Sequence, residues 1–263
     1  MGLEACVGGI GLVAPGMADW AAAQPLLRGE QLWQPTPLAA PKPDLLPANE
    51  RRRTTTLIRL ALAAAEQACS QACSQAGVAP EGLASVFASA EGDTEIVERL
   101  CTALNMAGKP VSPTQFHNSV HNAPAGYWAI AAGARLPSTS ITAGVASFAA
   151  GLLDALCYLQ AEQAPVLLIA YDVALPDSLS AHGDVQQPFA CALLLSPSGE
   201  GPRLLLDGIT TGEPSAVRAD LDALRRANPA AQALPLLHGL ANGKAERLAL
   251  RYVDQQLLNV VLR

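Results

Sequence analysis

The amino-acid sequence predicts an α/β fold in which helices cover a largely buried sheet. Half of the 263 residues are hydrophobic and 15% are charged, a balance that suits a sheet covered on both faces better than a disordered chain. Strand-like and helix-like segments alternate through most of the chain, as they do in α/β domains. The most apolar segment, Val-Leu-Leu-Ile-Ala-Tyr at residues 166–171, is expected at the centre of the sheet.

The N-terminal part of the chain begins with a predicted strand and continues into two predicted helices. The apolar run at residues 6–15 is typical of a buried strand, and Pro15-Gly16 ends it in a turn. Asp19 can cap a short helix that follows this turn. A proline-rich stretch at residues 34–48 predicts a surface loop, and apolar residues at helical spacing then predict a long helix over residues 49–77.

The alternation continues to residue 209 and becomes less regular afterwards. Further strands are predicted at residues 86–89, 138–142, 166–171, 190–195 and 203–209, and further helices at residues 93–106, 122–133 and 147–160. Beyond them, amphipathic patterns predict a helix over residues 215–227 and a last helix over residues 244–262, whose apolar stripe is expected to pack into the core, with contact to a partner as the alternative. We therefore expect one domain at residues 1–209 and a helical extension at residues 210–263 packed on it.

Composition and charge argue against several classes of function. The chain has 17 Lys and Arg against 23 Asp and Glu, and a net charge of −6 is not that of a nucleic-acid-binding protein. No secretory leader is visible, and the most apolar stretch, residues 141–153, is too short and too interrupted for a membrane span. A cytoplasmic protein with reduced cysteines is expected. No cofactor is expected either, because Gly9, Gly11 and Ala14 lead into Pro15-Gly16 and not into a helix.

Particular residues, in a consistent order, resemble the N-terminal half of the β-ketoacyl-ACP synthases. The match runs from about residue 3 to residue 209 and is carried by the Gly-x-Gly before Pro15-Gly16, Arg51 to Arg53 ahead of a long helix, Ser112-Pro113, Asn122, Ala125-Gly126, Gly133, Arg135, Pro137-Ser138 and Pro188-Phe189. The resemblance implies a thiolase-like layered fold. It also implies that the chain holds mostly a single half of that fold, a mixed five-stranded sheet between helices.

The resemblance fails at the catalytic nucleophile. In the family, the strand that corresponds to residues 138–142 leads into a tight turn with a cysteine, whose thiolate takes the acyl chain as a thioester. Here the turn reads Thr-Ala-Gly-Val-Ala-Ser over residues 142–147, and the nucleophile position falls on Gly144 or Val145, neither of which can be acylated. After residue 209 only His238 could serve as a catalytic histidine, and it lacks the family's sequence context.

The resemblance to an inactivated ketosynthase implies a non-catalytic subunit of the chain-length-factor type. Such a subunit pairs with an active β-ketoacyl-ACP synthase in polyketide, aryl polyene or fatty-acid-type chain elongation and meets an acyl carrier protein. By resemblance, Gln115, Phe116 and His117 are candidates to line or close the partner's acyl tunnel, with Phe116 as the best steric plug. The strand at residues 137–142, which includes Ser140, is expected to pair across the two-fold axis.

Arg51, Arg52 and Arg53 form a basic cluster expected at the start of a helix, where the helix dipole disfavours positive charge. A cluster placed against the dipole suggests attraction of an acidic carrier protein. The alternatives are a solvated basic patch or ion pairs with the partner subunit.

Other residues leave alternative functions open. Ser147 could be the nucleophile of a carrier-protein-dependent acyltransferase or thioesterase, or an ordinary N-cap or first-turn serine. A third possibility is a homodimer that binds acyl carrier protein without chemistry. Cys157 is expected to be a small buried hydrophobic residue, and Asp172 to cap or hydrogen-bond a loop.

Two pairs of residues have spacings that could suit a metal, although no metal site is expected. His117 and His121 would share one face of a helix, or else cap a turn at a subunit boundary. Cys69 and Cys73 belong to a repeated Cys-Ser-Gln-Ala sequence, interpreted as a duplicated turn of helix.

Overall fold

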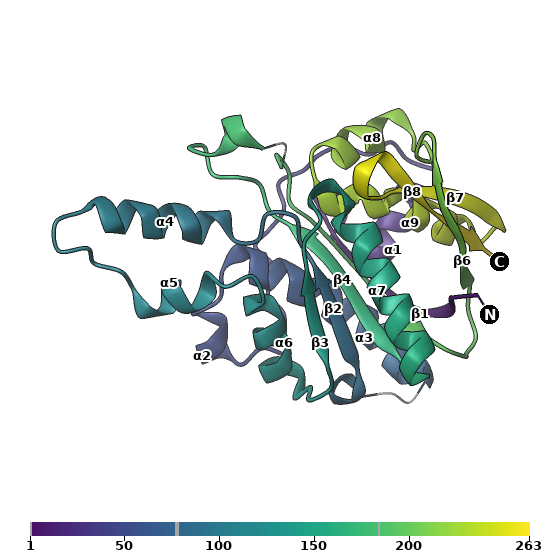
Figure 1. The fold of residues 1–263 in the computed structure, drawn as a ribbon, viewed down its shortest axis with the longest axis horizontal. Coiled ribbons are helices and arrows are strands. Elements are labelled where there is room, and N and C mark those ends of the chain that lie inside the picture. The colour runs from purple at the N-terminus through teal and green to yellow at the C-terminus, as the bar shows by residue number, and fades with distance from the viewer. Residues whose placement is uncertain (1, 77–78, 184) are drawn as a thin grey trace.

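A single mixed sheet runs through the computed structural model, which describes residues 2–76, 79–183 and 185–263 (Figure 1). Within these residues the sheet has eight strands in the order β3-β2-β4-β5-β1-β6-β8-β7. The strands are β1 (Glu4–Val13), β2 (Ala84–Ala88), β3 (Ser138–Ile141), β4 (Val166–Asp172), β5 (Phe189–Ser196), β6 (Arg203–Thr211), β7 (Glu246–Arg251) and β8 (Gln256–Leu262). The predicted α/β class is therefore confirmed.

Nine α-helices and several short 3₁₀ turns accompany the sheet in the described part of the chain. The helices are α1 (Trp20–Leu27), α2 (Ala48–Arg51), α3 (Thr56–Ala76), α4 (Thr94–Asn105), α5 (Pro113–Asn118), α6 (Ala123–Ala132), α7 (Ser147–Glu162), α8 (Ala219–Arg226) and α9 (Leu234–Asn242). Two of the 3₁₀ turns matter below: η2 (Gly144–Ala146) and η4 (Pro229–Ala233). As predicted, Asp19 caps α1, because its carboxylate accepts from the N–H of Ala22 at 2.7 Å.

The sheet is parallel at one end and antiparallel elsewhere. Strand β2 pairs in parallel with β3 and β4, and all other neighbouring strands are antiparallel. Every residue of β4 is buried, which confirms the central position predicted from its apolar sequence. Strand β3 lies at the edge of the sheet and has no strand on its outer side among the described residues.

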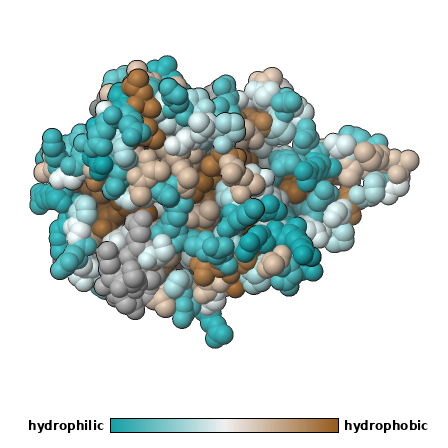
Figure 2. All heavy atoms as spheres, turned by 180° about the vertical axis from the view of Figure 1, so that it is seen from behind, coloured by the Kyte–Doolittle hydropathy of each residue, from teal (hydrophilic) through white to brown (hydrophobic). Residues whose placement is uncertain are grey.

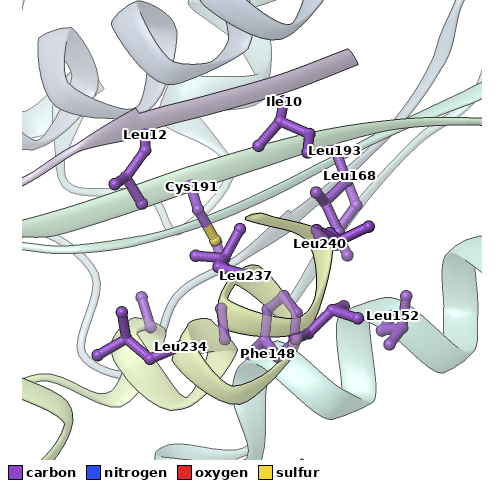
Figure 3. Close-up of a cluster of buried hydrophobic side chains, with 14 of the residues drawn as sticks. Ile10, Leu12, Phe148, Leu152, Leu168, Cys191, Leu193, Leu234, Leu237 and Leu240 are labelled. Atoms are coloured by element: carbon purple, nitrogen blue, oxygen red, sulfur yellow. The ribbon is translucent and has the colours of Figure 1, made fainter. Parts of the chain in front are cut away.

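Two hydrophobic layers cover the sheet. Helices α3 and α6 pack on one face with one cluster of buried residues, and α1, α7 and α9 pack on the other face with a second cluster. Figure 1 shows α7 in front of the central strands and α3 behind them. In Figure 3, Phe148 and Leu152 of α7 and Leu234 and Leu237 of α9 face strand residues such as Leu193. The C-terminal part of the chain thus belongs to the same core as the N-terminal part.

Helix α3 approaches β1 closely at Gly11. A Cβ atom at Gly11 would lie 1.9 Å from the carbonyl oxygen of Ala64, a distance that no side chain tolerates. The same helix holds the strand through Gln67, whose Oε1 accepts from the N–H of Leu12 at 3.0 Å. Glycine at position 11 is therefore a packing requirement of the layer.

The predicted long helix over residues 49–77 is broken near its start. Its first turn forms the separate helix α2, and α3 begins only at Thr56. Two threonine hydroxyls explain the break: Thr55 accepts from the N–H of Ile58 at 3.3 Å, and Thr54 donates to the carbonyl of Arg51 at 2.7 Å. Such side-chain bonds to the backbone end one helix and begin another. Residues 77 and 78 lie outside the described residues.

The prediction for the C-terminus was wrong. Residues 244–262 form the hairpin β7–β8 and not a helix, and they extend the sheet to eight strands where five were expected. The apolar residues of this segment fit a strand, because Leu248 and Leu250 alternate along β7, and Leu258 and Val260 along β8, and all four are buried. The preceding helix α8 is shorter than predicted, and the buried helix α9 was missed.

Residues 141–153 were expected to be too short for a membrane span, but helix α7 with its preceding turn, Gly144–Glu162, is long and apolar enough to span one by length and composition. Half of its apolar window is buried, however, and α7 packs against β2 and β4 as a core helix. Burial inside the protein explains its composition without a membrane.

Candidate functional site

The turn between β3 and α7 keeps the shape of a strand–turn–helix but presents no reactive side chain. Gly144 has a positive φ of 55°, and a Cβ atom placed on it would meet no atom within 4 Å. Val145 is 42% exposed. The backbone conformation at Gly144 favours glycine, and the position beside it carries an apolar group. Neither of the two candidate nucleophile positions can therefore form a thioester.

The hydroxyl of Ser147 forms hydrogen bonds with the backbone of the turn. It donates to the carbonyl of Gly144 at 2.7 Å and accepts from the N–H of Ala143 at 3.0 Å, and the residue is only 1% exposed. No histidine or carboxylate is among these partners. The hydroxyl therefore has the contacts of a structural first-turn serine and no adjacent base of the kind that activates a serine nucleophile.

Asp172, at the end of β4, anchors the loop between β2 and α4. Its Oδ1 accepts from the hydroxyl of Ser89 at 2.8 Å, from the N–H of Ala90 at 3.0 Å and from the N–H of Glu91 at 3.2 Å. Burial raises the pKa of Asp172 to about 6, although these hydrogen bonds act in the opposite direction. The prediction that Asp172 hydrogen-bonds a loop is confirmed.

Asn228 is a second buried polar residue at this edge of the sheet, and it was not identified from the sequence. Its Nδ2 donates to the carbonyls of Asp172 at 3.0 Å and Gln187 at 2.7 Å, and its Oδ1 accepts from the N–H of Ala230 at 2.8 Å. These bonds fix η4 against the ends of β4 and β5. An asparagine followed by proline, the start of a capped turn, was the only signal in the sequence.

The helices α4 and α5 form an arm, residues 94–118, that projects from the body of the protein (Figure 1). Large apolar side chains are exposed on this arm, and Phe116 is 66% exposed. In Figure 2, where the arm extends to the right, brown and pale side chains lie among hydrophilic ones. Of the three tunnel candidates, Phe116 and His117 are exposed on α5 and Gln115 is half-buried.

The base of the arm is tied to two other segments through Asn118. The Nδ2 of Asn118 donates to the carbonyl of Arg53 at 2.7 Å, and its Oδ1 accepts from the hydroxyl of Tyr127 at 3.1 Å. Asn118 is buried. The arm therefore leaves the body from a fixed base next to the arginine cluster.

Arg51, Arg52 and Arg53 do not stand in the first turn of a helix as predicted. Arg51 is the last residue of α2 and Arg52 its C-cap, positions where the helix dipole favours positive charge. The guanidinium of Arg51 donates to the carbonyl of Leu46 at 3.0 Å, and Arg53 pairs with Glu50 at 3.5 Å. The helix dipole therefore gives no reason to assign this cluster a contact with a carrier protein. Arg52 and Arg53 are nevertheless exposed.

His117 and His121 do not share a helical face. Helix α5 ends at Asn118, so His121 lies beyond it. The ring of His117 meets Tyr127 edge-on, with centroids 6.3 Å apart, and His121 Nε2 lies 3.4 Å from the carbonyl oxygen of Ile141. In the described part of the chain, no group of three or more His, Cys, Asp or Glu residues could hold a metal ion. The side chain of Cys73 lies outside the described residues.

The edge strand β3 and helix α7 border a pocket of about 290 Å³. Ser140 of β3 is half-buried and pairs in register with Phe87 of β2. Cys157 of α7 lines this pocket and is exposed, so the prediction that it is buried was wrong. The prediction rested on the general tendency of free cysteines to be buried, and that tendency does not tell which face of α7 a residue occupies.

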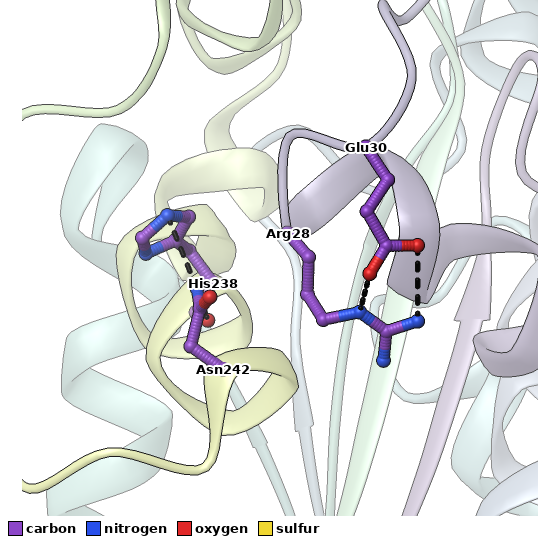
Figure 4. A network of polar contacts seen from close by, with 4 residues as sticks. All are labelled: Arg28, Glu30, His238 and Asn242. Atoms are coloured by element: carbon purple, nitrogen blue, oxygen red, sulfur yellow. Dashed lines mark hydrogen bonds and ion pairs between the residues drawn. The ribbon is translucent and has the colours of Figure 1, made fainter.

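The side chain of His238 contacts another residue of its own helix. Figure 4 shows its ring beside Asn242 of α9, with Asn242 Nδ2 3.3 Å from His238 Nε2. The same amide donates to the carbonyl of His238 at 2.9 Å. In the same view, Arg28 and Glu30 form an ion pair at the end of α1, which packs on α9. The hydrogen bonds of His238 thus stay within its own helix, α9, and do not reach the turn at residues 142–147.

The layered sheet, together with the strand–turn–helix at residues 138–162, defines a thiolase-like protein. The chain belongs to the beta-ketoacyl synthase family, whose N-terminal domain matches residues 20–255. The predicted resemblance to the N-terminal half of these enzymes is confirmed. No curated protein sequence matches the chain.

Solved structures of ketosynthase complexes are similar to the chain over its whole length. One chain in the structure of the complex between the ketosynthase ApeO and its chain length factor ApeC, from Xenorhabdus doucetiae, has 25% identity and a TM-score of 0.74, with 98% of this chain and 99% of that chain covered. The ishigamide ketosynthase/chain length factor has 15% identity and a TM-score of 0.70, with 99% of both chains covered.

A modular ketosynthase is similar over only part of its length. The ketosynthase from module 6 of the bacillaene synthase from Bacillus subtilis 168 has 15% identity and a TM-score of 0.58, with 79% of this chain and 41% of that chain covered. The thiolase-like ketosynthase fold is thus confirmed. The chain corresponds in length to chains from complexes with a chain length factor and to less than half of the modular enzyme.

Proposed function

We propose that this chain is a non-catalytic subunit of the chain-length-factor type, which pairs with an active β-ketoacyl synthase in the cytoplasm. The observation that carries the proposal is the turn at residues 142–147. It retains its position between an edge strand and a core helix, but Gly144 and Val145 offer no group that can hold an acyl chain. The similarity to ketosynthase complexes with chain length factors supports the same role.

The free edge of β3 is the proposed centre of the subunit interface. Unpaired backbone groups at the edge of a sheet are a template for pairing with another strand. The half-buried Ser140 lies on this edge, and the nearby pocket of about 290 Å³ offers a depression for a partner side chain. A ketosynthase that adds its own edge strand there would form one continuous sheet with this chain.

The arm is the proposed element that reaches the partner's acyl tunnel. A single chain leaves the apolar side chain of Phe116 66% exposed, whereas burial in a partner would remove it from water. A rigid aromatic ring can stop a growing alkyl or polyene chain sterically. We place Phe116 at the end of that tunnel, with Gln115 and His117 beside it. The products would be aryl polyenes or related polyketides.

The acyl carrier protein is the second proposed partner. Arg52 and Arg53 are exposed next to the base of the arm, where they could attract an acidic protein surface. Their contact would be electrostatic and would weaken as salt is added.

The experiment that tests the proposal co-expresses this chain with a ketosynthase and measures both the mass of the assembly and the length of the product. The substitution Phe116→Ala should leave the heterodimer intact and lengthen the product, because it removes the steric stop. Met106→Ala, at another exposed apolar residue of the arm, is the matched control and should not change product length. A ketosynthase whose assembly and products are indifferent to this chain would contradict the proposed function.

A further inference from the structure

An arginine-lined pocket lies beside the turn that carries Val145. It has a volume of about 590 Å³, within the range of small-molecule sites. Its polar lining comes from Gln186, Arg225, Arg226, Gln232 and Arg251. The pocket joins the end of β7, helix α8 and the turn at residues 142–147, three segments that are far apart in the sequence. Among the described residues that line it there is no carboxylate.

Two of the arginines share one counter-ion, and the third has none among the described residues. Asp222 pairs with Arg225 at 2.5 Å and with Arg226 at 2.6 Å. Burial alone would raise the pKa of Asp222, but the two guanidinium groups lower it, so the carboxylate stays ionised near neutral pH. Arg251 forms no ion pair with any described residue. Three guanidinium groups and one carboxylate leave two positive charges at this pocket.

One of the arginines is held in a fixed position. The Nε of Arg225 donates to Asp222 at 2.7 Å, and its Nη1 donates to the Oε1 of Gln232 at 3.1 Å. Gln232 is buried and in turn donates to the carbonyl of Arg225 at 3.0 Å. The guanidinium group has five N–H donors, and these contacts leave some of them free to bind an anion. Because the same contacts fix the position of the guanidinium group, the free donors are already oriented.

We infer that this pocket binds a small phosphate monoester, with its phosphate between Arg225 and Arg251 and its organic part against Val145. A phosphate monoester carries close to two negative charges at neutral pH and presents three acceptor oxygens, which match the two excess positive charges and the guanidinium groups that line the same pocket. Val145 supplies the apolar wall for the organic part. This ligand site goes beyond pairing with a ketosynthase and needs no partner chain.

The test is isothermal titration calorimetry on the full chain at low ionic strength. Glycerol 3-phosphate and inorganic phosphate should bind saturably, and diethyl phosphate, a singly charged diester, should bind several-fold more weakly. Arg251→Ala should weaken binding of the monoester about tenfold, the loss of one charge-assisted hydrogen bond. Arg247→Ala is the matched control, because Arg247 lies on the same strand but pairs with Asp207 outside this pocket.

A second variant tests the apolar wall without touching a charge. Val145→Trp should obstruct the pocket and abolish binding, and the exposed position lets the chain accept the larger side chain. Thermal unfolding checks that both variants fold. The inference is wrong if no phosphate binds, if Arg247→Ala weakens binding as much as Arg251→Ala, or if the monoester and the diester bind equally. It is also wrong if Arg251→Ala impairs only assembly with a ketosynthase, since the pocket would then be a protein contact.

Discussion

Replacing Asp172 by asparagine should change the pH dependence of stability in a defined direction. The three donors that meet Oδ1 keep an acceptor in Asp172→Asn, and only the longer bond from Ala90 N–H to Oδ2, at 3.2 Å, is lost. Asparagine does not ionise. The substitution therefore separates the cost of burying a charge from the loss of hydrogen bonds.

The sign follows from the raised pKa of Asp172. The folded state holds this proton up to about pH 6, whereas the unfolded chain releases it near the ordinary value of 3.8. The stability that the proton contributes is fully present below pH 3.8 and is lost as the pH rises through about 6. Between pH 4.5 and pH 7.5 the wild type should lose about 2 kcal/mol of unfolding free energy relative to Asp172→Asn.

Urea unfolding at the two pH values, followed by tryptophan fluorescence, measures this difference. The three tryptophans are buried, so unfolding exposes them all. Asp172→Ala should be less stable than Asp172→Asn at both pH values by about 2–4 kcal/mol, because Ser89, Ala90 and Glu91 lose their acceptor. Asp177→Asn, at an exposed aspartate, controls for the change in net charge. A difference between wild type and Asp172→Asn that does not vary with pH would refute the reasoning.

Two further substitutions test the turn and the close layer contact. Ser147→Ala should lower the unfolding free energy by about 1–2 kcal/mol, since two buried hydrogen bonds are lost, and urea unfolding measures it. Acylation of the wild type by a thioester substrate that disappears in this variant would contradict a structural role for Ser147. Gly11→Ala should destabilise by about 3 kcal/mol or more because of the clash with Ala64, whereas Gly82→Ala, with open space around it, should change thermal stability little. Equal melting temperatures for these two variants would contradict the packing assigned to Gly11.

Much of the fold was predictable because it depends on local patterns. The apolar run of β4 indicated a central strand, and Asp19 indicated the start of a helix. The turn at residues 142–147, which contains no cysteine, was recognised from its position between a predicted strand and a predicted helix. Each of these features is carried by neighbouring residues. The α/β class and the family could therefore be inferred before the structure was known.

The candidate site depended less on local patterns. Phe116 could be singled out by resemblance, but its exposure on a projecting arm follows from how α4 and α5 leave the body. The arginine-lined pocket was not predicted, because Arg225 and Arg251 have no common motif. They come together only when β7 joins the sheet.

The sequence by itself determined the α/β class, the family and the absence of a cysteine from the turn at residues 142–147, since each depends on the type and order of adjacent residues. Only the tertiary structure decided that residues 244–262 form a hairpin. Their leucines fit both a helical stripe and an alternating strand, and pairing of β8 with β6 selects the strand. The same long-range pairing places Arg251 near Val145. Contacts between distant segments, which no local pattern encodes, thus determined the shape and charge of the pocket.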